Sequence, residues 1–257
     1  MKLFKTRTNM SNLQKICLAG LFTALVTILQ KVLAVNYLPG FLFIRFSFGG
    51  PGLIIFSSIL LGPFYGLLIG AASDILGYFV FDMSGAGWWP QVTLTYALLG
   101  FFSYFVFWGI KRIKNKKLIM IIEAICFIAL IAFVAFYLFK IADVETWIKI
   151  VIPWAIAVLI IGLSIFIFIF DRKVKLKVGY NVFQISLCSF VLELIILLGF
   201  GSVMKAWAFG WESFLLIFAA QSVVMFFNIV VDTIVISLLL NATKKYFISE
   251  NKVDWVC

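Results

Sequence analysis

The first group in this chain whose type and spacing could do chemistry is a carboxylate that follows a row of glycines. Gly62, Gly66, Gly70 and Asp74 are spaced by four residues, so they share one face of a helix. Glycine rows let membrane helices pack closely. Counted at about 1.5 Å per residue from Pro63, Asp74 reaches the middle of an apolar layer, where an ionised carboxylate costs at least about 2.5–3.5 kcal/mol. We expect it to be partnered, protonated or facing a polar cavity, in either a functional or a structural role.

A second group of polar residues lies near the C-terminus. Gln221, Met225, Asn228 and Asp232 occur at i, i+4, i+7 and i+11 and share one helix face. Glu193, in the preceding apolar segment, is expected toward the outer half of the membrane. Together these residues predict an outward-opening polar cavity lined by several helices.

Two Gly- and Pro-rich interruptions, 43–52 and 82–91, separate apolar blocks, and such interruptions point to transporter binding sites. Aromatic rings there could stack on a flat ligand, although an interfacial aromatic belt explains tryptophans equally well. Arg45 could bind a carboxylate bidentately or extend to outer headgroups as an anchor. The candidate substrate-binding residues are Arg45, Trp88, Trp89, Gln91, Glu193 and Trp207. The candidate intramembrane polar residues are Asp74, Gln221, Asn228 and Asp232.

Several chemistries are excluded by the residues present. The chain has no histidine, which removes Ser-His-Asp, Cys-His and HExxH mechanisms. It has no GxxxxGK[ST] loop for nucleotide phosphates. The membrane acids are expected at different depths, and the four cysteines are scattered without metal-ligand spacing. The sequence therefore predicts a protein that is not an enzyme and has no metal site or cofactor.

The elements that must position these residues are transmembrane helices. The chain is 64% hydrophobic and 12% charged, against about 45–50% and about 25% in soluble domains. Its apolar blocks approach the ~20 residues that cross a bilayer as a helix. The sequence predicts an all-α integral membrane protein of eight transmembrane helices. The expected spans are 16–35, 41–61, 64–81, 92–110, 118–139, 150–170, 178–204 and 213–240.

The distribution of Lys and Arg predicts the orientation of these helices. Sixteen of the 21 basic residues fall in segments that an eight-span chain places on one side, namely 1–15, 111–117, 171–177 and the C-terminal tail. Because positive loops stay inside, both termini are expected in the cytoplasm of a multi-pass plasma-membrane protein. The net charge of +10 then indicates contact with anionic lipid, and no nucleic-acid partner is needed.

Residues 118–170 differ from the rest because they are almost entirely Ile, Phe, Leu and Ala. Their removal would leave six helices and join two cytoplasmic loops. We therefore expect an inserted two-helix hairpin at 118–177, between a first part of the core at 1–117 and a second part at 178–257.

Four runs of residues, taken together, resemble a known family. They are Arg-Phe-Ser-Phe at 45–48, Leu-Gly-Pro-Phe-Tyr-Gly at 61–66, Gly-Ala-Ala-Ser-Asp-Ile-Leu-Gly-Tyr at 70–78 and Trp-Pro-Gln-Val-Thr-Leu at 89–94. Their order and spacing resemble the substrate-binding (S) subunits of energy-coupling factor (ECF) vitamin transporters, most closely the folate type. The resemblance covers about residues 15–110, and less clearly 178–245. The family has six helices, so 118–177 departs from it.

The resemblance implies a high-affinity outward pocket that delivers a vitamin, with folate favoured, to a coupling transmembrane subunit and two ATPases. It also implies that small residues of the first helix, here Gly20 and Ala24, contact the coupling subunit. Trp88 and Gln91 depart from the family pattern and leave other substrates open, namely riboflavin, thiamine or a queuosine precursor. A non-transport membrane scaffold, whose polar residues only join helices, is the remaining alternative.

Overall fold

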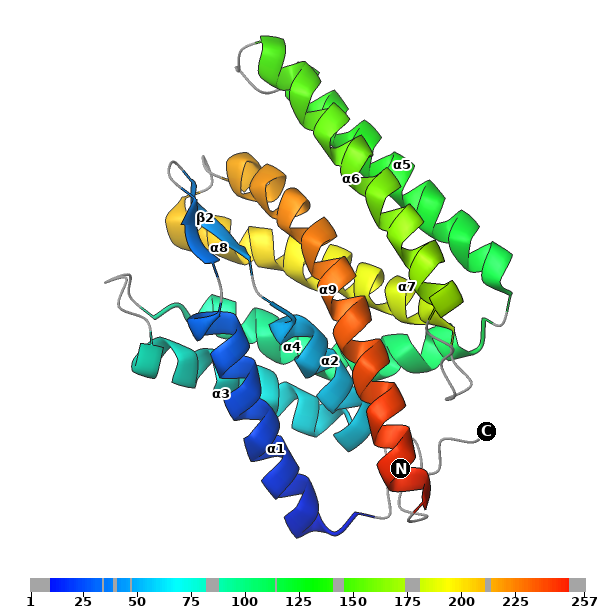
Figure 1. Cartoon of the computed structure of the whole chain (residues 1–257). Helices are drawn as coiled ribbons and strands as arrows, with labels where there is room; N and C mark the ends of the chain where they lie inside the picture. The colour runs from blue at the N-terminus through cyan, green and yellow to red at the C-terminus, as the bar shows by residue number, and fades with distance from the viewer. Residues whose placement is uncertain are drawn as a thin grey trace.

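The computed structural model describes residues 10–33, 35–38, 41–46, 48–81, 88–113, 115–140, 146–173, 181–210 and 214–249. The described chain is a bundle of helices with one short hairpin of strands (Figure 1). The helices are α1 (Asn12–Thr27), the π-helical η1 (Ile28–Val32), α2 (Gly50–Leu61), α3 (Pro63–Phe81), α4 (Pro90–Lys111), α5 (Lys116–Lys140), α6 (Thr146–Lys173), α7 (Val182–Leu192), the π-helical η2 (Glu193–Phe200), α8 (Gly201–Phe209) and α9 (Phe214–Ser249). The strands β1 (Val35–Leu38) and β2 (Phe41–Phe46) pair antiparallel.

The helix boundaries follow from local sequence signals. α1 begins at a capping box, in which Ser11 and Gln14 each bind the other's backbone N–H. α2 begins after Gly49, whose positive φ of 83° suits glycine, and carries Pro51 in its first turn. Gly62, with a φ of 102°, separates α2 from α3. The chain therefore turns sharply on both sides of a short helix.

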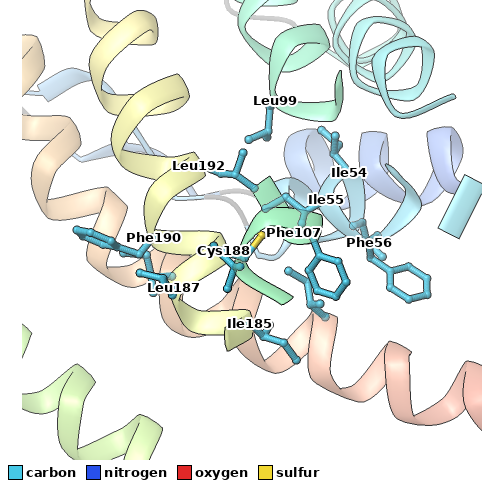
Figure 2. Packing of buried hydrophobic residues seen from close by; sticks show 14 of the residues in the cluster. Ile54, Ile55, Phe56, Leu99, Phe107, Ile185, Leu187, Cys188, Phe190 and Leu192 are labelled. Atoms are coloured by element: carbon cyan, nitrogen blue, oxygen red, sulfur yellow. The ribbon is translucent and has the colours of Figure 1, made fainter. Parts of the chain in front are cut away.

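The buried core is centred on α2. All α2 residues except Ile59 are buried. Figure 2 shows Ile54, Ile55 and Phe56 of α2 in the same cluster as Leu99 of α4 and Phe190 of α7. A helix that is apolar all round lies either in a core or in lipid, and the burial of α2 shows that it lies in the core. The surrounding helices therefore hold α2 in place.

The predicted close packing of the glycine face is confirmed, and α4 is the helix that packs against it. A Cβ at Gly66 would meet the carbonyl oxygen of Gly100, and a Cβ at Gly100 would meet the carbonyl oxygen of Gly66. One turn further along α3, a Cβ at Gly70 would meet the carbonyl oxygen of Tyr96. Backbone approach of this kind is how membrane helices associate, and it fixes α3 against α4.

The prediction of an all-α integral membrane protein is confirmed. Among the described residues, five helical segments are long and apolar enough to cross a membrane: Asn12–Val32, Pro63–Phe81, Pro90–Lys111, Val182–Trp207 and Val224–Thr243. The expected span at 41–61 is wrong, because its first part forms β2 and only 12 residues form α2. Twelve helical residues rise about 18 Å, short of the ~30 Å hydrocarbon core. A total of eight spans stays a prediction.

α5 and α6 pack against each other and extend away from the other helices (Figure 1). At their base, Lys116 Nζ lies 2.9 Å from Asp171 Oδ2. α5 also contacts α7, and α6 contacts α7 and α9. These helices fall within the predicted insertion, whose status as an insertion stays a prediction together with the division into 1–117, 118–177 and 178–257.

Candidate functional site

The first part of the candidate site is a buried ion pair. Lys31 Nζ lies 3.6 Å from Asp74 Oδ1, and each side chain is only 6% exposed. Lys31 belongs to η1 and Asp74 to α3. The expectation that Asp74 needs a partner in the membrane is therefore met by a lysine from the first helix. Two paired charges replace one isolated charge, which lowers the cost of burial.

The glycine face of α3 makes room for this lysine. A Cβ at Gly77 would collide with the Lys31 side chain at Cγ and Cε. The aliphatic stem of Lys31 therefore crosses α3 at Gly77 before its ammonium group reaches Asp74, one turn earlier along the same face. Nearby, the Thr27 hydroxyl donates to the carbonyl oxygen of Ser73 at 3.3 Å and joins α1 to α3.

A chain of hydrogen bonds leads from the ion pair to the surface of the bundle. The Thr93 hydroxyl donates to Asp74 Oδ2 at 2.7 Å. The Trp88 indole N–H donates to Thr93 Oγ1 at 3.0 Å. The Trp88 side chain is 40% exposed, and its ring lies 6.4 Å from the Phe79 ring. Trp88 is thus an exposed aromatic side chain whose orientation is set by a buried carboxylate.

The second part of the candidate site joins η2 to α9. Glu193 is 1% exposed and interacts with Asn228 and Asp232, with Lys205 in electrostatic range. Asp232, fully buried, accepts a hydrogen bond from the Gly52 backbone N–H at 2.9 Å. Gly52 lies in the first turn of α2, where backbone N–H groups lack helical partners and negative charge is favoured. Asp232 therefore acts as a distant cap for α2.

The same turn of α2 contacts a buried amide from the first helix. Gln30 of η1 is 2% exposed, and a Cβ at Gly50 would collide with its Cγ. Within the described residues, neither amide atom of Gln30 has a hydrogen-bond partner. Gln30 and Asp232 thus contact the first turn of α2 from two different helices.

Gln221 lies in a polar contact between α8 and α9. With its amide oxygen directed at Lys205 Nζ, its nitrogen donates to Ser202 Oγ and to the Leu197 carbonyl, each at 3.1 Å. Gln221 and Asn228 are both buried, at 9% and 7% exposed. The predicted polar face of α9 therefore points into the bundle, toward η2 and α8.

The other predicted site residues occupy different surroundings. Trp207 on α8 is 63% exposed, and Trp89 and Gln91 are half-buried beside the start of α4. The backbone of Arg45 lies in β2 opposite Asn36 of β1. Gly20 and Ala24 are exposed on α1. Among the described residues, no group of three or more His, Cys, Asp or Glu could hold a metal ion.

Sequence reasoning missed Lys31, Thr93 and Gln30. Lys31 does carry a usable signal, because a cation among the apolar residues of a membrane helix indicates a buried carboxylate nearby. Thr93, two residues beyond Gln91, gave no distinguishing signal. The contact between Asp232 and Gly52 joins residues 180 positions apart, so no local pattern could predict it.

The fold and the site together define a class of protein. A helical membrane protein that buries charged and amide side chains beside irregular backbone has the construction of a membrane-embedded binding subunit. The family model of the ECF-type riboflavin transporter, S component, matches residues 10–142, just over half of the chain. The chain belongs to this family. No curated protein and no solved structure is similar enough to this chain to match it.

Membership confirms the prediction of an ECF S subunit in the plasma membrane. Such subunits bind a vitamin and work with a coupling transmembrane subunit and ATPases, and the family is one of transporter components rather than enzymes. The match extends through α5, beyond the resemblance seen at 15–110. The folate type stays a prediction.

Proposed function

We propose that this S subunit binds a folate at the outer side of the membrane and delivers it to its coupling subunit. The supporting observation is the position of the hairpin, whose strand β2 packs on α9, the helix that carries Asp232 (Figure 1). Folate needs aromatic surfaces for its rings, hydrogen-bond partners for the pterin edge, and a cation for its glutamate tail. We assign the aromatic surface to Trp88, the hydrogen bonds to the pterin edge to Glu193, and the cation to Arg45.

Arg45 is the cation proposed for the glutamate tail. β2 holds its backbone opposite Asn36, in the hairpin directly before α2. A guanidinium group binds a carboxylate through two parallel hydrogen bonds, which a lysine cannot reproduce.

Riboflavin is the second candidate, and the match to the family of the ECF-type riboflavin transporter, S component, favours it. Riboflavin has a flat ring system but no carboxylate. The tryptophans would serve it as well as folate, whereas Arg45 would have no carboxylate to bind. The two vitamins therefore make opposite demands on Arg45.

Titration of the full chain in detergent with folate and with riboflavin decides between the two vitamins. We expect tight binding of folate and recovery of a folate after gentle purification, detected by mass spectrometry of the released small molecules. Tight riboflavin binding without folate binding would replace the substrate and keep the S-subunit function. Binding of neither vitamin would contradict both candidates.

Arg45→Ala is expected to weaken folate binding by about 2–5 kcal/mol, because loss of a buried charge pair leaves the ligand carboxylate unpaired. Arg45→Lys should restore only part of the affinity. Arg112→Ala is the matched control, because Arg112 packs on Trp108 at the C-terminal end of α4, whereas Trp88 and Trp89 precede its N-terminal end. An Arg45→Ala protein that binds folate with unchanged affinity would show that Arg45 is a membrane anchor.

A further inference from the structure

We propose that Thr93 is a positioning residue of the vitamin site, whose hydroxyl group holds the Trp88 indole in the orientation that stacks on a flat vitamin ring. This inference rests on the proposed function, in which Trp88 supplies the aromatic surface, and it names the residue on which that surface depends. Thr93 lies near the start of α4, and Trp88 precedes this helix.

Trp88 requires a fixed orientation because it lies at the surface of the bundle. Its side chain is 40% exposed, and its neighbour Phe79, at 6.4 Å between ring centroids, is itself 70% exposed. Ordering a mobile side chain on binding lowers affinity, whereas a side chain that is already fixed avoids this cost. The 3.0 Å hydrogen bond from Trp88 Nε1 to Thr93 Oγ1 ties the exposed ring to a residue that is only 8% exposed. Thr93 is therefore a buried point of attachment for Trp88.

The direction of the hydrogen bonds at Thr93 follows from the groups on either side of it. An indole N–H only donates, and a carboxylate only accepts. The Thr93 hydroxyl accepts from Trp88 and donates to Asp74 Oδ2 at 2.7 Å. Because Asp74 is the anionic member of the ion pair with Lys31, the hydroxyl hydrogen points at Asp74 and a lone pair points at Trp88. The ion pair thus sets the acceptor that Trp88 finds.

The separation between Thr93 and Asp74 is set by backbone packing. A Cβ at Gly70 would collide with the carbonyl oxygen of Tyr96, so α3 and α4 lie in close contact there. Gly70 is one turn before Asp74 on α3, and Tyr96 is about one turn after Thr93 on α4. The close contact therefore lies beside the hydrogen bond that joins the two helices, and it holds the acceptor for the Trp88 N–H in place.

Thr93 acts through Trp88 rather than on the ligand directly. Its hydroxyl hydrogen is engaged by Asp74, its oxygen accepts from Trp88, and its side chain is buried. A ring that stacks on Trp88 meets the indole face. The alternative role of Thr93 is purely structural, in which it satisfies Asp74 and fastens α4 to α3 without any effect on Trp88.

The first test measures folate binding to the full chain in detergent by isothermal titration. Thr93→Val keeps the shape of the side chain and removes the hydroxyl, and we expect it to weaken binding about 2- to 10-fold, the cost of ordering one side chain. Thr93→Ser keeps the hydroxyl and should restore most of the affinity. Thr95→Val is the matched control, because the buried Thr95 hydroxyl donates only to the Gln91 carbonyl of its own helix. It should leave the affinity unchanged.

A second variant separates positioning from a purely structural role. Trp88→Phe keeps an aromatic ring but has no N–H to donate to Thr93. In the Trp88→Phe background, Thr93→Val should have no further effect on folate affinity, whereas a purely structural effect would have the same size in both backgrounds. Equal effects in the two backgrounds would overturn the positioning role.

The hydrogen bond itself is tested without any vitamin by NMR of the full chain containing isotope-labelled tryptophan. The indole N–H resonance of Trp88 is identified by its absence in Trp88→Phe. It should move to higher field in Thr93→Val and keep its position in Thr93→Ser. An unmoved resonance in Thr93→Val would overturn the inference. Thr93→Ala, which leaves room for water beside Asp74, replaces Thr93→Val in both tests if the valine variant is not monodisperse.

The outcomes separate this inference from the proposed function. Folate binding to Thr93→Val with unchanged affinity would overturn the positioning role and keep folate as the substrate. If the chain binds riboflavin instead of folate, the choice of vitamin is overturned, and the same pair of backgrounds is measured with riboflavin, whose ring is also flat. Coupling between Thr93 and Trp88 would then support the positioning role, and its absence would overturn it. Binding of neither vitamin would overturn both proposals.

Discussion

The buried pair of Lys31 and Asp74 provides the sharpest test of the candidate site. Asp74→Asn keeps the size of the side chain and can still accept the hydrogen bond from Thr93, but it removes the charge facing Lys31. Lys31→Met removes the other charge and keeps an apolar stem of similar length against Gly77. Each change leaves one buried charge without its partner.

The size of the effect follows from the geometry. At 3.6 Å and an effective dielectric constant of about 20, two unit charges attract by about 5 kcal/mol. Desolvation offsets much of this attraction in the intact pair, but removal of one partner typically destabilises by about 3–5 kcal/mol. We therefore expect each single variant to lose about 3–5 kcal/mol in free energy of unfolding. The double variant Lys31→Met/Asp74→Asn should lose less than the sum of the two.

The assay is reversible unfolding of the purified chain by SDS in mixed micelles, followed by tryptophan fluorescence. The double-mutant cycle should show a coupling energy of at least about 2 kcal/mol. Lys116→Met and Asp171→Asn form the control cycle. That pair is closer, at 2.9 Å, but its side chains are 46% and 19% exposed, so its coupling should be at most about 1 kcal/mol.

A coupled buried pair is contradicted if both single variants cost less than about 1 kcal/mol and their effects add, because buried and exposed pairs would then behave alike. A larger coupling in the control pair would refute it as well. Either result would mean that water or another group satisfies Asp74, and that the Trp88–Thr93–Asp74 chain does not depend on Lys31.

Two further predictions concern packing and coupling. Gly100→Val should destabilise the chain by about 1–3 kcal/mol or more, because the valine side chain would collide with the backbone of α3 at Gly66. Gly109→Val is the control and should be close to neutral, because a Cβ at Gly109 meets nothing within 4 Å among the described residues. Equal shifts of the unfolding temperature in the two variants would contradict the packing of α3 on α4. Ala24→Trp should abolish vitamin uptake in cells that also contain the coupling subunit and the ATPases, because Ala24 is exposed on α1 and a large side chain there would block close helix packing. The purified variant should still bind the vitamin in detergent. Gly162→Trp on α6 is the control, and normal uptake by Ala24→Trp would place the coupling face elsewhere.

The sequence predicted the helical membrane fold because the composition and length of the apolar blocks determine it almost alone. The glycine spacing on α3 also predicted close packing correctly, since a four-residue interval has one structural meaning in a helix. The partner of Asp74 was not predictable in this way. Lys31 of η1 reaches Asp74 across Gly77, which leaves space for the lysine stem.

The segment at 41–61 was mispredicted for a related reason. Apolar residues lie on both sides of the interruption at 43–52, and they form different elements: the first part forms β2 of a hairpin and the second forms α2 in the core. The cluster Gly49-Gly50-Pro51-Gly52 was the available signal of a change in backbone direction. The contact of Asp232 with Gly52 then required the folded positions of α2 and α9, which periodicity along one helix cannot supply.

The two π-helical segments place limits on how this chain can be altered. Lys31 lies in η1 and Glu193 begins η2, and each such segment holds more residues per turn than an α-helix. Deleting one residue from either would restore ordinary helical winding, and the helix beyond it would keep nearly its present orientation, because the wider turn absorbs one extra residue. The residues inside the segment, Lys31 or Glu193 among them, would shift instead. Among homologues, we therefore expect a single-residue gap in either segment to accompany loss of its buried charge.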